Sequence, residues 1–159
     1  MPLAPWRHPP TSALIAFALL SIALAGCSGK GGSTDTAQAR ATGTAACDNA
    51  ALLRAQSARR TDLEVTFCGP VSAVRRERVT RSGRHKYFYV RVAPGDEIEV
   101  IANVDVMGEF PVHLGDQAQV RGRYFHDSDG RQGVDWTHHD TVGSRWPPGY
   151  VILNGVTYR

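Results

Sequence analysis

Runs of alternating apolar and polar residues constrain the fold of this chain more than any other feature of its sequence. Alternation with a period of two is typical of a strand that buries one face. Short strands at this spacing, separated by turn residues, predict a small antiparallel barrel or sandwich. The expected strands span residues 63–79, 86–93, 97–104, 117–125 and 134–138, with a hairpin at 150–159.

The strands are expected to belong to one domain, residues 47–159, which is of ordinary size for a single domain. Residues 48–60 are rich in Ala, Leu, Gln and Arg and predict a short helix before the strands. The first long run is expected to break or bulge at Gly69-Pro70, because proline cannot donate to an interior ladder. Asn154-Gly155 is the expected turn of the last hairpin.

The amino-terminal region has the pattern of an export signal. The apolar run at residues 13–25 is too short to span a bilayer and follows a segment containing Arg7. It ends in Leu-Ala-Gly-Cys at residues 24–27, which resembles the bacterial lipobox. The resemblance implies a signal peptide at 1–26 and acyl chains, palmitate among them, on Cys27. The alternative is ordinary secretion with a chance cysteine.

The lipobox resemblance also implies a location. Several acyl chains on one residue form a firm membrane anchor. Ser28 rather than aspartate follows Cys27, which by the sorting rule of enteric lipoproteins implies the outer membrane, with the domain facing the periplasm. Residues 27–46 are small and polar and predict a flexible tether between the lipid and the domain.

Export decides how the other two cysteines are interpreted. Cys47 and Cys68 form an even pair in an oxidising compartment, which favours a disulfide. Free or metal-binding thiols are the alternative.

Charge is unevenly distributed along the domain. Residues 70–92 hold seven basic residues against one acidic residue, whereas residues 93–140 hold ten carboxylates against three arginines. The basic half predicts a surface for phosphate, lipopolysaccharide or an acidic polymer. The alternative is a solvated face whose charges are balanced by the acidic half.

The string WTHHD, residues 136–140, is the most distinctive motif in the chain. In an extended strand, alternate side chains point to opposite faces, so the two imidazoles would not share one ion. A zinc or other divalent metal site would need further ligands. The metal candidates are His85, His138, His139 and Asp140. The alternatives are a histidine that is buried and bonded to Asp140, which locks the strand end, and proton-transfer chemistry.

Aromatic and cationic residues on the second expected strand suggest a ligand face. Tyr87, Tyr89 and Arg91 share one face, Phe88 and the valines beside it face the core, and Trp136 is expected nearby. Residues 113–125, HLGDQAQVRGRYF, resemble the fourth-strand region of OB-fold barrels. Such barrels hold bases or sugars on aromatic side chains beside cations. The alternative is that the tyrosines only cover the sheet.

Several strings together resemble a bacterial family of small exported proteins classified as a domain of unknown function. SGRHKYFYV, IANVDV, LGDQAQVRGRYF, GVDWTHHD and GYVILNGVTY carry the resemblance over about residues 65–159. In this family the motif usually continues with proline, where this chain has Thr141. The residues that match the family's pattern are His85, Asn103, Asp105, Gly155 and Tyr158. The resemblance implies no activity.

These observations lead to one principal hypothesis and two rivals. The principal hypothesis is an envelope lipoprotein with a mostly β, OB-like barrel of five or six strands and one amino-terminal helix. It would be a non-enzymatic binding module for a polyanion, sugar or partner protein, with nucleic acid a less favoured ligand. The rivals are a metal-dependent hydrolase and a structural envelope protein. The ligand-site candidates are His85, Tyr87, Tyr89, Arg91, Asn103, Asp105, Trp136, His138, His139 and Asp140.

Overall fold

The computed structural model describes residues 45–139, 141, 143 and 146–159. These residues belong to one compact unit, Ala41–Arg159. The expected signal peptide, the lipidation site Cys27, most of the tether and Asp140 lie outside the described residues. Within the described part of the chain, no helix is both long and apolar enough to cross a membrane.

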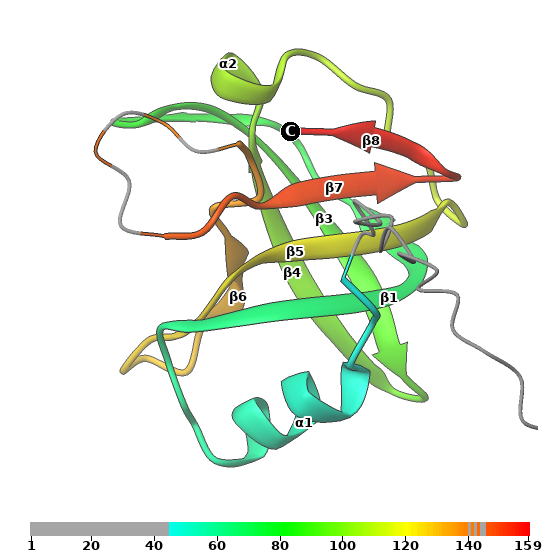
Figure 1. Ribbon diagram of the computed structural model, residues 1–159, viewed down its shortest axis with the longest axis vertical. Coiled ribbons are helices and arrows are strands. Elements are labelled where there is room, and N and C mark those ends of the chain that lie inside the picture. The colour runs from blue at the N-terminus through cyan, green and yellow to red at the C-terminus, as the bar shows by residue number, and fades with distance from the viewer. Residues whose placement is uncertain (1–44, 140, 142, 144–145) are drawn as a thin grey trace, which may run out of the picture. The chain divides into compact units, whose positions relative to one another are not determined.

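The secondary structure is mostly β, as predicted, with two short helices (Figure 1). The elements are α1 (Asn49–Ser57), β1 (Leu63–Val74), β2 (Arg78–Thr80), β3 (Gly83–Ala93), β4 (Asp96–Asn103), α2 (Val104–Met107), β5 (Gln117–His126), β6 (Gln132–Asp135), β7 (Tyr150–Leu153) and β8 (Val156–Tyr158).

Five of the strands close into a barrel. The order β1-β3-β4-β6-β5 returns to β1 through a long antiparallel pairing of β1 with β5. All pairings in this ring are antiparallel except that of β4 with β6, which is parallel. A five-stranded barrel with this strand order is the OB architecture. The expected OB-like barrel is therefore confirmed, and β2, β7 and β8 are additions to it.

The predicted break at Gly69-Pro70 is a corner of the barrel rather than an interruption. β1 pairs with β5 from Leu63 to Pro70 and with β3 from Val71 onward, and its bulge lies between Val71 and Ala73. A Cβ on Gly69 would lie 1.9 Å from the carbonyl oxygen of Arg91, so the close approach of β3 requires glycine.

The ends of two predicted strands differ from expectation. The first run does not continue to residue 79, because β1 ends at Val74 and β2 begins separately at Arg78. The run at 134–138 ends at Asp135, because Trp136 has a φ of 52°, which turns the chain out of the extended conformation. The WTHHD string is therefore not a strand end with alternating faces.

The core lies inside the barrel and beneath α1. Phe88, Val90 and Val92 of β3 point inward, as predicted. Leu52 of α1 is fully buried in the same cluster, so the helix covers one end of the barrel, while α2 lies toward the other (Figure 1). Asp48 caps α1 by accepting a hydrogen bond of 2.8 Å from the Ala51 N–H.

The predicted disulfide joins Cys47 to Cys68, with the two Cα atoms 5.7 Å apart. It ties the start of α1 to β1. The Asn49 side chain reinforces this link, because its amide donates to the carbonyl of Cys68 at 2.8 Å and its oxygen accepts from the Cys68 N–H at 2.9 Å. The alternative of free or metal-binding thiols is therefore wrong.

The carboxy-terminal hairpin is present as predicted. β7 pairs with β5 and β8 pairs with β7, and both Asn154 and Gly155 have positive φ at the turn between them. Positive φ at both central residues is the geometry of a tight hairpin turn, for which Asn-Gly is the preferred pair.

Candidate functional site

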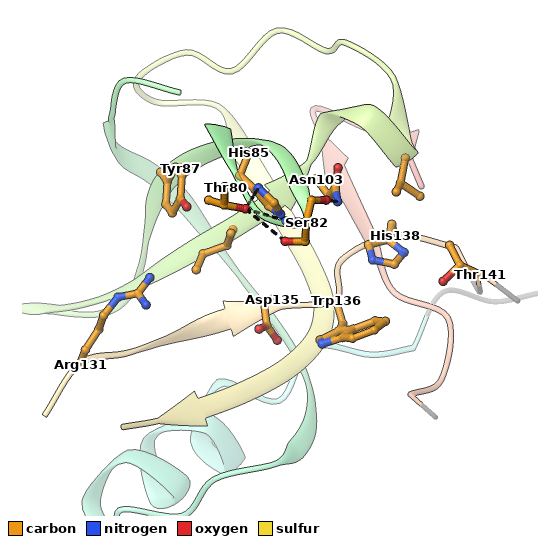
Figure 2. A pocket seen from close by; sticks show the side chains of 12 residues that line it. Thr80, Ser82, His85, Tyr87, Asn103, Arg131, Asp135, Trp136, His138 and Thr141 are labelled. Carbon is orange, nitrogen blue, oxygen red and sulfur yellow. Dashed lines mark hydrogen bonds between the residues drawn. The ribbon is translucent and has the colours of Figure 1, made fainter. Parts of the chain in front are cut away.

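A cavity of about 380 Å³ opens on the side of the barrel formed by β3, β4 and the chain that follows β6 (Figure 2). Its walls come from several places in the sequence. The turn between β2 and β3 contributes Ser82, β3 contributes His85 and Tyr87, β4 contributes Asn103, and Arg131 comes from the loop between β5 and β6. Trp136 and His138, which follow β6, also line the cavity. The volume lies within the range of small-molecule pockets.

His85 is held in one orientation and one tautomer. Its side chain is buried, and its Nδ1 lies 2.9 Å from the Gly83 carbonyl oxygen and 3.2 Å from the Thr80 hydroxyl. Because a carbonyl oxygen only accepts, Nδ1 carries the proton and donates it to Gly83. In the neutral imidazole, Nε2 then carries the lone pair, and the side chain lines the cavity.

His138 has the same arrangement on the other side of the cavity. Its Nδ1 lies 2.7 Å from the carbonyl oxygen of His139, so Nδ1 again donates and Nε2 is the acceptor. The imidazole lies beside Trp136, with ring centroids 5.4 Å apart. Two imidazoles of fixed tautomer thus line one cavity from separate segments.

The Trp136–His138 segment is fixed by close backbone packing. The buried Thr137 hydroxyl donates to the carbonyl of Ile101 on β4 at 3.2 Å, and the Gly149 N–H donates to the carbonyl of His138 at 2.7 Å. A Cβ on Gly122 of β5 would lie 2.3 Å from the Asp135 carbonyl oxygen. The segment therefore sits where only glycine leaves room for it.

Asn103 and Asp105 act mainly as a clamp between β4 and the β2–β3 turn. The Asn103 amide donates to the Ser82 carbonyl at 2.9 Å, and the Asp105 carboxylate accepts from the Arg84 N–H at 2.8 Å. Asn103 lines the cavity, whereas Asp105 does not. These two candidates hold the turn that positions His85.

The face of Tyr87, Tyr89 and Arg91 is divided between two hollows. Tyr87 is buried at the edge of the first cavity. Tyr89 and Arg91 line a second, wider hollow of about 890 Å³ near the β3–β4 turn. Guanidinium groups cover both rings: that of Arg78 lies 5.1 Å from the centroid of Tyr87, and that of Arg75 lies 5.4 Å from the centroid of Tyr89.

The candidate metal ligands are only partly brought together. His85 and His138 line the same cavity, but His139 is exposed and does not line it, and Asp140 lies outside the described residues. Within the residues that the structure describes, no group of three or more histidine, cysteine or acidic side chains is placed to hold a metal ion. The alternative hypothesis, in which Asp140 locks a buried histidine, depends on the same residue and therefore also lies outside the described part of the chain.

Asp135 also lines the cavity, although no feature of the sequence marked it as a candidate site residue. Both of its oxygens accept from Arg123, at 2.8 Å from Nε and 2.5 Å from a terminal nitrogen. This hydrogen bonding raises the pKa of Arg123. The pairing of Asp135 with Arg123 depends on the register of β5 and β6, which places the two residues opposite each other. This register is not visible in the sequence.

The fold and the cavity define a small OB-type barrel with a ligand-sized hollow on its β3–β4 face. The chain belongs to the family described as "Protein of unknown function (DUF3465)", which matches residues 36–159. The match covers the whole described domain and confirms the expected membership of an uncharacterised family. No curated protein matches the chain.

Proposed function

We propose that this protein is a non-enzymatic binding module that holds a saccharide in the cavity beside His85, Trp136 and His138. The observation that carries the proposal is the location of the cavity. OB barrels bind oligosaccharides and oligonucleotides on the face of their second and third strands, between two flanking loops. Here those strands are β3 and β4, and the flanking segments contribute Ser82 and Arg131.

The chemistry of the wall supports a saccharide. Sugars offer hydroxyl groups in fixed directions and an apolar ring face. The cavity offers two imidazole acceptors of fixed tautomer, hydroxyl groups on Thr80 and Ser82, and the indole of Trp136. A mostly preformed cavity with a few placed polar groups is typical of a small-ligand site.

The test is a glycan array followed by calorimetry on the soluble domain, residues 28–159. Wild type is expected to bind a saccharide, and Trp136→Ala is expected to lose at least about tenfold in affinity, equivalent to roughly 1.4 kcal/mol. Thr157→Val on the exposed edge strand β8 is the control and should bind like wild type. Equal affinity in Trp136→Ala would contradict the proposal.

His85 offers a sharper test of the site. Asparagine can keep a donor for the Gly83 carbonyl near the position of Nδ1, but it places nothing at the position of Nε2. His85→Asn is therefore expected to keep its melting temperature and lose ligand. Loss of stability without loss of affinity would point to a structural role for His85 instead.

The envelope setting is part of the same proposal. Lipid on Cys27 would anchor the domain to the outer membrane, facing the periplasm, through the 27–46 tether. Labelling cells with an alkyne analogue of palmitate should mark the wild-type chain and not Cys27→Ser. A Cys27→Ser chain that still labels and fractionates with the membrane would contradict this part.

A metal-dependent hydrolase is the second candidate, because of one observation. Both cavity histidines donate Nδ1–H to a backbone carbonyl, the arrangement that orients metal-binding imidazoles. The test is the metal content of the untagged domain by mass spectrometry, alone and after zinc titration. Stoichiometric zinc that is lost in His85→Asn and His138→Asn would favour the hydrolase over the binding module.

A further inference from the structure

Four arginines on the connection from β1 to β3 have no carboxylate partner among the residues that the structure describes. Nearby cations are paired: Lys86 and Arg84 share Glu77 at 3.1 and 3.3 Å, and Arg91 pairs with Glu97 at 3.2 Å. Glu77 is also the one acidic residue of this segment, so it is already occupied. The unpaired arginines are Arg75, Arg76, Arg78 and Arg81, all exposed.

This finding bears on the two interpretations of the basic half, because carboxylates of the acidic half pair with Arg84, Lys86 and Arg91 but not with these four arginines. Had the acidic half also paired with these four arginines, carboxylates would lie within ion-pair distance of them. Two carboxylates of β4 and β6 are paired with other arginines, since Asp135 holds Arg123 and Glu99 holds Arg131 at 3.0 Å. The connection therefore presents four guanidinium groups to the solvent.

Two of these guanidinium groups are fixed along β3. Arg78 stacks over Tyr87 and Arg75 stacks over Tyr89, and both tyrosines point to the same side of the strand. Stacking restrains the guanidinium plane while its edge keeps N–H donors for an anion. Two residues along a strand span about 6.6 Å, so the two stacked arginines lie beside successive positions on the same side of β3 and form a short row.

The row connects the two hollows on this face. Tyr87 borders the cavity beside His85, and Tyr89 and Arg91 border the second hollow. From residue 87 to residue 91 the strand rises about 13 Å. A chain-like ligand that lay along β3 would contact the cavity, the stacked arginines and the second hollow in succession.

We infer that the ligand is a linear acidic polysaccharide, which runs along β3 with one sugar in the cavity and its anionic groups on the β1–β3 arginines. This inference rests on the proposed function and names its substrate class. Nucleic acid is the less favoured ligand, because proteins that bind single strands without sequence preference stack the bases on open aromatic faces. Tyr87 is only 6% exposed, and arginines cover both tyrosine rings.

The test uses a fluorescent oligogalacturonate, a neutral maltooligosaccharide of equal length and an oligo-dT strand. The variant Arg76→Ser/Arg78→Ser/Arg81→Ser removes three of the four unpaired cations. The control Arg59→Ser/Arg60→Ser/Arg159→Ser removes three exposed cations from the end of α1 and the carboxyl terminus. Both carry the same net charge, and melting temperatures verify that both fold.

The expected result is specific to the charge and its position. The first triple variant should lose at least about tenfold in affinity for oligogalacturonate at low salt, and the control should change less than about twofold. The wild-type affinity should fall as salt is raised, and fall less steeply in the first variant. Equal losses in both triple variants would overturn the inference, because the attraction would then be a general effect of net charge.

Two further outcomes separate this inference from the proposed function. Binding of the maltooligosaccharide but not of oligogalacturonate, with loss in Trp136→Ala, would overturn the polyanion and leave the saccharide module standing. Absence of binding to any saccharide would overturn both. Oligo-dT bound more tightly than oligogalacturonate, and weakened by the same arginine variant, would overturn the polysaccharide in favour of nucleic acid.

Discussion

The backbone of Gly149 lies against the carbonyl group of Trp136, so closely that an added Cβ would be 2.1 Å from the oxygen. The same Cβ would lie 2.8 Å from the Cα of Thr137. Because the atoms in the way belong to the backbone, no side-chain rotation relieves the contact. The residue before the last hairpin thus fixes the segment that forms one wall of the cavity.

Gly149→Ala is therefore expected to displace Trp136 and His138. Overpacking of a buried site costs about 1–3 kcal/mol, and a backbone clash belongs at the upper end of that range. Denaturant unfolding measures the loss, and calorimetry measures the accompanying loss of saccharide affinity. Pro148→Ala, at the exposed neighbouring residue, is the control. Wild-type stability in Gly149→Ala would show that the segment can move freely.

Thr137→Val tests the link between the segment and β4. The buried hydroxyl donates to the Ile101 carbonyl, and valine fills nearly the same space without a donor. The expected loss is about 1 kcal/mol in the free energy of unfolding. Thr157→Val, at an exposed position on β8, should change it by less than about 0.5 kcal/mol. Equal losses in both variants would contradict a specific role for the Thr137 bond.

The Cys47–Cys68 disulfide is expected to contribute stability through the chain that it closes. The cysteines are 21 residues apart, for which the chain-entropy model gives about 3 kcal/mol. Cys47→Ser/Cys68→Ser should therefore lower the melting temperature by roughly 10 °C. Adding a reductant should lower the melting temperature of the wild type by the same amount and leave the melting temperature of the double variant unchanged. A wild-type melting temperature insensitive to complete reduction would contradict this account.

Asp116 gives a prediction for pH. Hydrogen bonds from the backbone N–H of His113, at 2.7 Å, and from the amide of Asn154, at 2.9 Å, lower the pKa of Asp116. A carboxyl with a lowered folded-state pKa stabilises the fold above its unfolded pKa of about 3.9, and the contribution is lost as pH falls through the folded pKa.

Asp116→Asn should thus be less stable than wild type at pH 7, and the difference should shrink as pH falls below about 4. The measurement is urea unfolding across pH for both proteins. Asp127→Asn, on the exposed β5–β6 loop, is the control and should follow the wild-type profile. A stability difference that is constant across pH would show that the charge of Asp116 is not involved.

The sequence alone determined the strands and turns of the barrel, because the signals for them are local. Alternation along residues 86–93 identified Phe88, Val90 and Val92 as core, and the structure buries all three. Asn154-Gly155 specified its turn, since few residues accept positive φ there. The two cysteines specified their disulfide, because no other pairing exists within the domain.

Only the tertiary structure decided how the site is assembled, because its parts meet through register and close approach. The turn at Trp136 ends β6 earlier than the alternation predicted, and a non-glycine residue gives no warning of positive φ. That turn, packed against Gly122 and Gly149, brings His138 to the cavity of His85 and leaves His139 exposed. The unpaired arginines likewise emerge only in three dimensions, since charge balance depends on which carboxylates fold within reach of each cation.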